Sequence, residues 1–340
     1  MSLDITGNYR YPPPDEEWLG RSVEAALEPS LPIIDPHHHL WEQHQPPYFL
    51  DALKADVQSG HAVVATVCVE SHFRYRQYGP AHLRPVGETE AVMALIAANE
   101  GSPRLCAGIV AHADLTLGAG VDEVIEAHRV VAGERLKGIR HSVSRDEHFP
   151  NGIVIRPAPR GLLADARYRD GLKRLASCGL SYDAMLYHAQ IPELTDTAAA
   201  ISDLPIVLDH FGCILGVGPY EALKAESFDS WRRNLRDLAQ RENVSIKLGG
   251  MGMIVCGARY HEYPAPPGSV ALAADFAPYV ETAIEAFGPS RCMFESNFPV
   301  DKAMYSYRTL WNAFKRLTAR HTARERAYLF HDTAKAFYRL

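Results

Sequence analysis

The sequence predicts an α/β protein that folds as one (β/α)₈ barrel of the TIM type, with an N-terminal arm and C-terminal helices. Two observations predict it: eight apolar segments alternate with helical segments along the 340 residues, and none of these segments is followed by a glycine-rich nucleotide-binding loop. A barrel of this kind accommodates such a length as a single domain. The alternative, a doubly wound open sheet, is disfavoured because no G-x-G-x-x-G or G-x-x-x-x-G-K-[ST] loop follows any segment.

Composition and charge restrict the class of protein. Hydrophobic residues make up 47% of the chain and charged residues 22%, which is typical of a globular domain. The net charge of -6 argues against a nucleic-acid partner, because binding to phosphates requires clustered Lys and Arg. No apolar stretch reaches 18 residues, so we expect no membrane partner. The six cysteines form no C-x-x-C pair and the N-terminus lacks an apolar signal segment, so we expect reduced thiols and a cytoplasmic location.

The chain divides into an arm and a barrel. Residues 1–30 are rich in proline and polar residues, with a short apolar patch at Trp18 and Leu19, and we expect them to lie on the body as an arm. Residues 31–340 form the predicted barrel, whose strands are near-continuous apolar runs, as in parallel sheets covered on both faces. The predicted strands are residues 33–39, 61–70, 105–112, 136–141, 180–188, 205–212, 244–250 and 292–299.

Helical segments lie between these strands. Residues 228–241 place Trp231, Leu235 and Leu238 at helical spacing on one face. Residues 87–99 are an alanine-rich apolar run, and two helices finish the chain after the eighth strand. The predicted helices are residues 49–59, 87–99, 120–132, 169–178, 191–200, 228–241, 272–287, 304–320 and 323–338.

The first strand ends in three consecutive histidines. Strand alternation predicts that Asp35, His37 and His39 share one face and that His38 points to the other. Two imidazoles on one face are a pair of metal ligands or proton-transfer groups. A surface histidine cluster is the alternative, but here the run closes an apolar segment.

Polar residues also close the other predicted strands. Because the active site of such a barrel lies at the C-terminal ends of its strands, this clustering predicts an enzyme site. The residues are His37 and His39, Glu70, His112, Arg140 with His141, His188, His210, Lys247, and Glu295 with Asn297.

These residues resemble the amidohydrolase superfamily. The resemblance rests on Asp35-x-His37-x-His39, on the histidines that close the fifth and sixth strands, and on M-F-E-S-N-F-P at residues 293–299. It is closest to the amidohydrolase-related branch, which includes lactonases of 2-pyrone-4,6-dicarboxylate and of L-fucono- and L-rhamnono-lactones, and it covers residues 33–340. In metal-dependent members, the matching histidines surround one or two divalent ions, and an eighth-strand Asp is a ligand and the general base.

This chain departs from that pattern at two positions. Asn297 occupies the place of the eighth-strand Asp, and an amide cannot accept a proton near neutral pH. Three interpretations remain: Glu295, two residues earlier, supplies the carboxylate; a histidine is the base in a metal-independent or differently metallated site; or the chain has lost hydrolysis. Arg140 stands near the place of the Lys that binuclear members carboxylate, so we expect one divalent ion, Zn or Mn, or none.

The resemblance implies a role for each histidine. His37, His39 and His188 form a mononuclear metal site or bind the substrate carbonyl directly. His210 is an acid/base or polarising group. Glu295 is the substitute carboxylate, and Asn297 is a hydrogen-bonding residue.

Two cationic residues suit a substrate that carries a carboxylate. The guanidinium of Arg140 pairs bidentately with carboxylates, and Lys247 supplies a second charge. The alternative is that both form salt bridges in the barrel wall with Glu70 or Glu295. Glu70 and His112 are expected to line the pocket as substrate-binding residues. The alternative for Glu70 is the salt bridge just named, and for His112 it is a hydrogen-bonded structural role. Asp209 is expected to face the helix layer, and His141 to lie outside the site.

We therefore predict a hydrolase of a small cyclic ester, or of a related carbonyl compound, that acts with or without one divalent metal. One alternative is a metal-dependent decarboxylase or hydratase of an unsaturated or aromatic acid. Another is a non-catalytic ligand-binding barrel in which Asn297 marks lost activity. The partner is a small-molecule substrate in the enzyme interpretations, and a homo-oligomer stays open because the apolar helix at residues 307–317 suits either the barrel or a second subunit.

Overall fold

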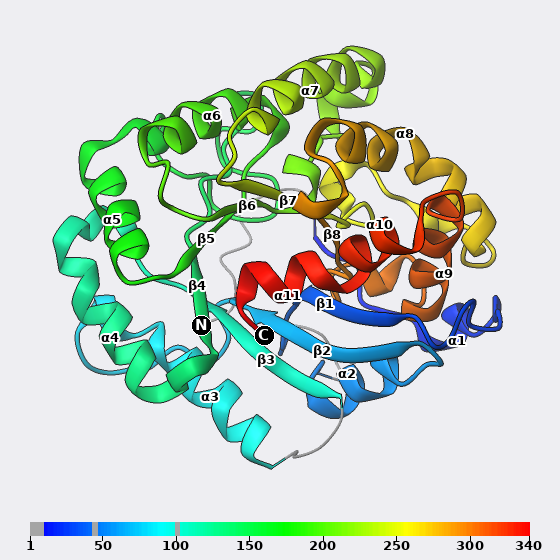
Figure 1. The fold of residues 1–340 in the computed structure, drawn as a ribbon, viewed down its shortest axis with the longest axis horizontal. Helices are drawn as coiled ribbons and strands as arrows, with labels where there is room; N and C mark the ends of the chain where they lie inside the picture. Colours follow the sequence, from blue (N-terminus) through cyan, green and yellow to red (C-terminus); the bar gives the residue numbers. More distant parts are fainter. Residues whose placement is uncertain (1–9, 43–46, 99–102) are drawn as a thin grey trace.

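All eight predicted apolar segments form strands, which pair in parallel and in sequence order around a barrel (Figure 1). The computed structural model describes residues 10–42, 47–98 and 103–340. Most strand residues are buried, as expected for strands that are covered on both faces. The strands are β1 (Pro32–His38), β2 (Ala62–Val69), β3 (Arg104–Ala111), β4 (Leu136–Arg140), β5 (Ser181–Ala184), β6 (Ile206–Leu208), β7 (Val244–Leu248) and β8 (Cys292–Phe294). The predicted barrel is therefore confirmed.

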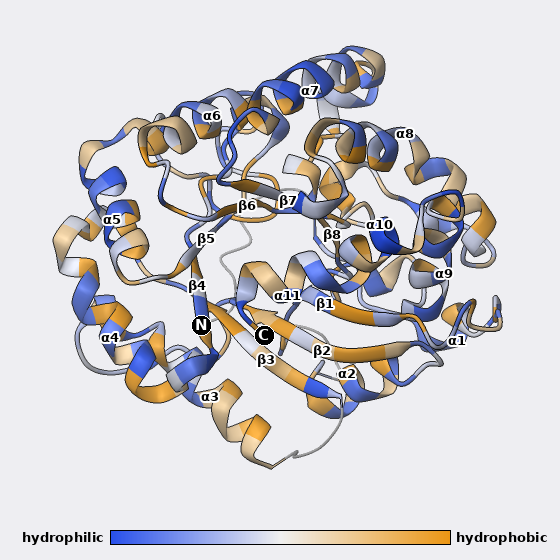
Figure 2. Ribbon diagram, in the orientation of Figure 1, coloured by the Kyte–Doolittle hydropathy of each residue, from blue (hydrophilic) through white to orange (hydrophobic). Residues whose placement is uncertain are grey.

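Helices surround the barrel in Figure 1. In Figure 2 the strands β2 and β3 are largely hydrophobic, whereas the helices carry both hydrophilic and hydrophobic residues, as expected of a layer between the barrel and water. Across the three described ranges, no helix combines the length and apolar character needed to cross a bilayer. The helices are α1 (Glu16–Leu19), α2 (Leu50–Val57), α3 (Val86–Ala97), α4 (Val121–Ala132), α5 (Ala166–Ser177), α6 (Ile191–Ala200), α7 (Lys224–Ala239), α8 (Ser269–Phe287), α9 (Tyr307–Leu317), α10 (Ala323–Ala327) and α11 (Thr333–Tyr338).

The barrel closes between β1 and the segment that follows β8. The backbone N–H of His39 donates to the carbonyl oxygen of Phe298 at 2.7 Å, and that of Asn297 donates to the carbonyl oxygen of His37 at 2.9 Å. His38 and Phe298 form a parallel bridge. Closure of the barrel thus brings the histidines of the first strand next to the residues that end the eighth.

The C-terminal helix α11 closes the opposite end of the barrel. Its residues Ala334 and Tyr338 pack in one apolar cluster with residues of β1, β2, β3, β6 and β8. Lys137, near the start of β4, donates from Nζ to the carbonyl oxygen of Arg339 at 3.0 Å. Because α11 covers the N-terminal ends of the strands, the C-terminal ends are left for the site.

The segment predicted as an arm lies against the loops and helices that follow β7 and β8. The indole N–H of Trp18 donates to the carbonyl oxygen of Tyr263 at 2.8 Å. Farther along, the backbone N–H of Leu27 donates to Oδ1 of Asn312 in α9, also at 2.8 Å. Trp18 and Leu19, the apolar patch seen in the sequence, are both buried. Residues 1–9 of the predicted arm lie outside the described residues.

The predicted orientation of Asp35 in β1 is wrong. Asp35 does not share the side of His37 and His39, because the strand register shifts between Asp35 and His38. Its carboxylate instead accepts hydrogen bonds from the hydroxyl of Tyr307 in α9 at 3.0 Å and from the backbone N–H of Ser296 at 3.0 Å. Asp35 therefore links β1 to the helix layer and to the end of β8.

Candidate active site

The predicted pair on the first strand is present at the C-terminal end of the barrel. The Nε2 atoms of His37 and His39 lie 3.3 Å apart. His39 donates from Nδ1 to the carbonyl oxygen of Val69 at 2.9 Å, so its Nε2 carries the lone pair. Burial lowers the pKa of His37 to about 4, assisted by the charge of Lys247. Burial and the neighbouring His37 also lower the pKa of His39, so both rings are neutral at pH 7.

Glu295 holds two imidazoles at once. Its Oε1 accepts from Nδ1 of His210 at 2.6 Å, and its Oε2 lies 2.9 Å from Nδ1 of His37. Burial raises the pKa of this carboxyl, but His210 and His37 outweigh that effect and lower the pKa to about 2. Because the Val69 carbonyl and Glu295 accept from Nδ1 of His39 and His210, Nε2 is the nitrogen that these two rings present for a metal or a proton. Nδ1 of His37 lies between Oε2 of Glu295 and Nζ of Lys247, which is 3.1 Å away.

The backbone near His210 allows Glu295, His210 and the loop after β7 to approach one another closely. His210 has a φ of 54°, in the left-handed region that a non-glycine residue rarely adopts. A Cβ atom on Gly249 would lie 2.4 Å from Cγ of Glu295, and one on Gly250 would lie 2.6 Å from Cγ of His210. The two glycines after β7 therefore make room for the Glu295–His210 pair.

Two cations that lie next to His37 are paired with buried carboxylates. Nζ of Lys247 lies 2.7 Å from Oδ2 of Asp183 and 3.0 Å from Oδ1 of Asp209, and Lys247 is 0% exposed. Arg140 donates from Nε to Oε1 of Glu70 at 2.7 Å. The sequence predicted Lys247 and Glu70 as substrate-binding residues, with salt bridges as the alternative. The structure places both in salt bridges and gives Lys247 no contact with solvent.

Asp209 corrects a second expectation. It was expected to face the helix layer, but its carboxylate lies 3.6 Å from Nδ1 of His37 and 3.6 Å from Nη1 of Arg140. Strand β6 ends at Leu208, so the alternation of faces does not extend to Asp209 and His210. Both residues therefore reach the site.

His188 is not part of this cluster, contrary to the predicted ligand set. Strand β5 ends at Ala184, and His188 begins a short 3-10 turn four residues later. Its Nδ1 accepts from the backbone N–H of Leu215 at 3.3 Å, and its ring contacts that of Tyr220. Among the described residues, the group close enough to share a metal ion is His37, Asp209 and His210, whose ligand atoms all lie within 4.8 Å of one another.

Asn297, which the sequence predicted as a site residue, forms a hydrogen-bonded pair with Asp301, which it did not. The amide of Asn297 donates to Oδ1 of Asp301 at 2.8 Å. Asp301 also accepts from the backbone N–H of Gly252 and from the hydroxyl of Tyr305, while burial raises its pKa to about 6. Asp301 lies two residues beyond residue 299, where the eighth predicted strand ends, so it was not among the polar residues that close a predicted strand.

His112 and His141 lie beside the site and contact each other. Nδ1 of His112 donates to the carbonyl oxygen of Arg140 at 3.0 Å, and its ring packs against His141 and His72. His112 therefore makes the kind of hydrogen bond expected of its structural alternative.

A pocket of about 90 Å³ opens onto the histidines. Its lining combines polar side chains with aromatic and aliphatic ones, so it suits a small molecule that carries both polar and apolar groups. The polar residues are His39, Glu70, Ser71, His72, Arg140, Ser142, His210 and Asn297, and the others are Tyr11, Trp41, Ile155, Met185, Met253 and Val300.

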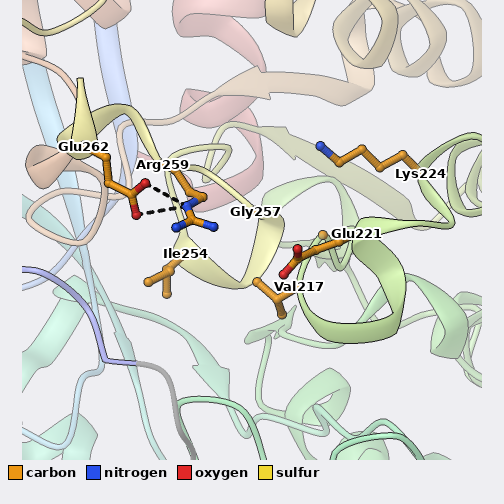
Figure 3. A pocket seen from close by; sticks show the side chains of 8 residues that line it. Val217, Glu221, Lys224, Ile254, Gly257, Arg259 and Glu262 are labelled. Atoms are coloured by element: carbon orange, nitrogen blue, oxygen red, sulfur yellow. Dashed lines mark hydrogen bonds and ion pairs between the residues drawn. The ribbon is translucent and has the colours of Figure 1, made fainter. Parts of the chain in front are cut away.

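A larger cavity of about 450 Å³ lies away from the histidines, between the loops that follow β6 and β7. Figure 3 shows Arg259 paired with Glu262 in this cavity, with Glu221 and Lys224 on the other side. None of the predicted site residues lines it. The smaller pocket is therefore the one in contact with groups able to move a proton or hold a metal.

Comparisons with known proteins identify the family of this chain. The model of a family described as "Amidohydrolase" matches residues 34–340. An uncharacterised protein of Sinorhizobium fredii, y4mH, is 34% identical over 91% of this chain and 99% of its own length. An L-fucono-1,5-lactonase of Burkholderia multivorans is 26% identical over 90% of this chain and 96% of its own length.

Solved structures share the fold. An amidohydrolase of Burkholderia multivorans with bound zinc has a TM-score of 0.69 at 24% identity, covering 91% of this chain and 99% of that one. A putative 2-pyrone-4,6-dicarboxylic acid hydrolase of Pseudomonas putida has a TM-score of 0.58 at 19% identity, covering 91% and 97%. A 5-carboxyvanillate decarboxylase of Sphingomonas paucimobilis has a TM-score of 0.52 at 15% identity, covering 91% and 99%. By the family match and the relative that is 34% identical, the chain belongs to the amidohydrolase family of hydrolase enzymes.

Proposed function

We propose that this chain hydrolyses a small lactone in the pocket lined by His39, His210 and Arg140. The observation that carries the proposal is Glu295, one buried carboxylate that orients both His37 and His210 through Nδ1. The names of two relatives support the substrate class, since both are L-fucono-1,5-lactonases. The pocket volume of about 90 Å³ suits one small ring rather than a polymer.

The residues present fit one divalent ion. Two ligands of a tetrahedral zinc ion lie about 3.4 Å apart, close to the 3.3 Å between Nε2 of His37 and Nε2 of His39. The buried cations Lys247 and Arg140 contact the carboxylates Asp183, Asp209 and Glu70. Glu295, which pairs with imidazoles, is a fourth carboxylate, so the group carries a formal charge of −2 when the imidazoles are neutral. A divalent cation would balance that charge.

We place the ion on His37 and His39, because this choice leaves His210 for proton transfer. The alternative set of His37, Asp209 and His210 uses His210 as a ligand. When bound, such an ion polarises a carbonyl and lowers the pKa of water. Glu295 then orients His37 as an outer partner of a metal-bound imidazole.

The chain's own residues carry the proton steps. His210, whose Nδ1 donates to Glu295, accepts through Nε2 the proton of a water molecule as that water adds to the lactone carbonyl. The guanidinium of Arg140, which lines the pocket, stabilises the oxyanion of the tetrahedral intermediate. His210 then returns the proton to the ring oxygen as the C–O bond breaks, and the product is a hydroxy acid. Asn297, fixed by Asp301, orients the substrate by hydrogen bonding.

The test is turnover of a panel of small lactones by the purified protein, measured as acid release at pH 7. The panel contains L-fucono-1,5-lactone, other five- and six-membered sugar lactones, and 2-pyrone-4,6-dicarboxylate. We expect turnover of at least one member by the wild type and a loss of at least about 100-fold in kcat for His210→Asn. A partly exposed control away from the pocket, His331→Asn, keeps the wild-type rate. Equal rates for wild type and His210→Asn would contradict the proposed role of His210.

A further inference from the structure

The N-terminal segment contributes one residue, Tyr11, to the wall of the active-site pocket. Tyr11 precedes the residues matched by the family model, which begin at residue 34. It nevertheless lines the same pocket as His39, Arg140 and His210. Tyr11 is therefore a pocket residue that lies outside the part of the chain matched by the family model.

Helix α1 anchors this segment at the mouth of the barrel. Asp15 caps the helix by accepting from the backbone N–H of Trp18 at 3.0 Å. The indole of Trp18 is buried and donates to the carbonyl oxygen of Tyr263 in the loop after β7, and Glu16 pairs with Lys302, which follows β8, at 2.9 Å. Both of these partners belong to loops at the C-terminal ends of strands, where the site lies.

Only three residues separate Tyr11 from this anchor, and all three are proline. Each proline ring fixes φ near −65°, so the segment from residue 12 to residue 14 has little freedom. The position of Tyr11 in the pocket therefore follows from the docking of α1 rather than from contacts of Tyr11 alone.

The side chain of Tyr11 contributes an aromatic ring and a hydroxyl group to the pocket. Its ring contacts that of Trp41 edge to face, with centroids 6.0 Å apart and planes at 84°. Burial raises the pKa of Tyr11, and the charges of Asp301 and Arg140 are close enough to act on its hydroxyl. In the part of the chain that the structure describes, no group accepts a hydrogen bond from this hydroxyl. A phenol in that position is ready to donate to a ligand.

We propose that Tyr11 is a substrate-binding residue that covers the pocket and limits the size of the ring that enters. The proposal rests on the proposed lactone hydrolysis for the identity of the substrate. Tyr11 and Trp41 pack against the C–H side of a five- or six-membered sugar lactone, and the Tyr11 hydroxyl donates to one of its oxygens. The polar lining residues Arg140, His210 and Asn297 receive the carbonyl.

The test compares Tyr11→Phe and Tyr11→Ala with the control Tyr78→Ala, whose side chain is exposed and lies in another loop. Because Trp18 and not Tyr11 anchors the segment, all three variants are expected to fold. The first readout needs no substrate: diethyl pyrocarbonate modification of His39 and His210, followed by peptide mass spectrometry. We expect about fivefold faster modification in Tyr11→Ala and no change in Tyr78→Ala. An unchanged rate in Tyr11→Ala would overturn the covering role, whatever the enzyme hydrolyses.

The second readout is the split between KM and kcat on the lactones that the wild type hydrolyses. We expect Tyr11→Phe to raise KM by about 3- to 10-fold with kcat within about threefold, because only the hydroxyl is lost. Tyr11→Ala raises KM further and admits larger lactones. Unchanged KM and unchanged substrate range in both variants would overturn the proposal. Absence of wild-type turnover would contradict the proposed function alone, since the modification rates still decide whether Tyr11 covers the histidines.

Discussion

Glu295 is the residue on which the proposed chemistry depends most, because its two oxygens orient two imidazoles. Replacing it by the isosteric amide in Glu295→Gln keeps the shape but removes the charge that stabilises a protonated His210. We expect kcat to fall by about 100-fold or more, with a smaller change in KM. Steady-state kinetics on the best lactone measures both values. The exposed Glu285→Gln serves as the control, and a full rate in Glu295→Gln would show that His210 does not need this partner.

Metal content distinguishes the two possible ligand sets around His37. The double variant His37→Ala/His39→Ala removes both Nε2 donors of the first strand. We expect about one equivalent of zinc or manganese per wild-type chain, none in the double variant, and an unchanged content in His210→Asn. Elemental analysis after dialysis measures these contents. If His210→Asn loses the ion as completely as the double variant, the ion lies instead on His37, Asp209 and His210.

At the residue scale, the sequence marked part of the site and missed the rest for a definable reason. The strand ends predicted that six of the site residues would meet, because each lies within its strand or at most three residues beyond it: His37, His39, Arg140, His210, Glu295 and Asn297. Asp209 was misplaced because the alternation rule was applied beyond Leu208, where β6 ends. His188 was misplaced because β5 stops at Ala184. Short strands are the common cause of both errors.

At the scale of the element, Lys247 holds β5, β6 and β7 together from inside the barrel. It contacts Asp183 of β5 and Asp209, which follows β6, and burial lowers its pKa less than these carboxylates raise it. Lys247→Met leaves two buried carboxylates without their cation, which costs about 3–5 kcal/mol. Urea unfolding at pH 7 measures this loss, with the exposed Lys224→Met as the control. A variant of wild-type stability and higher KM would instead support substrate binding by Lys247.

Helix α3 carries a carboxyl group that makes stability depend on pH. Burial and the nearby Glu70 raise the pKa of Glu88 to about 8. The folded state holds this proton, whereas the unfolded state releases it near pH 4.5. The contribution of Glu88 to the free energy of unfolding is therefore fully present below pH 4.5. It is lost as the pH rises through about 8.

Glu88→Gln, which stays neutral, removes this dependence. Between pH 5 and 8.5 we expect the free energy of unfolding of the wild type to fall by about 3 kcal/mol relative to the variant. Urea unfolding across this pH range is the measurement. The matched control is Glu90→Gln on the same helix, which is exposed and pairs with Arg76. Parallel pH profiles for wild type and Glu88→Gln would show that Glu88 titrates normally.

At the scale of the whole molecule, the barrel was the most predictable feature, because the local sequence pattern of each segment predicts its strand or helix. The run at residues 61–70 and the helix at residues 191–200 required no knowledge of the rest of the chain. The structural roles of the N-terminal and C-terminal segments were harder to predict. Neither the packing of Tyr338 inside the barrel nor the reach of Tyr11 into the pocket follows from periodicity, since both depend on contacts between distant segments.

The closure of the barrel by α11 therefore predicts a large effect of one terminal residue. The hydroxyl of Tyr338 donates to Oδ2 of Asp183 at 2.6 Å, and its ring lies in the inner cluster. Tyr338→Ala opens a cavity there, and we expect a loss of about 3–5 kcal/mol in the free energy of unfolding. Chemical denaturation compares this variant with Tyr328→Ala in the preceding turn, which is partly exposed. Equal stability of both variants would mean that α11 does not support the barrel.

The central claim is that His210, oriented by Glu295, drives addition of water to a lactone. Turnover of L-fucono-1,5-lactone or the best lactone of the panel in water enriched in oxygen-18 tests it most directly, with the product acid analysed by mass spectrometry. The account predicts one oxygen-18 atom in each product carboxylate and at least about 100-fold less enzymatic product with His210→Asn. Enzymatic product without the label, or equal labelled product from wild type and His210→Asn, would contradict it.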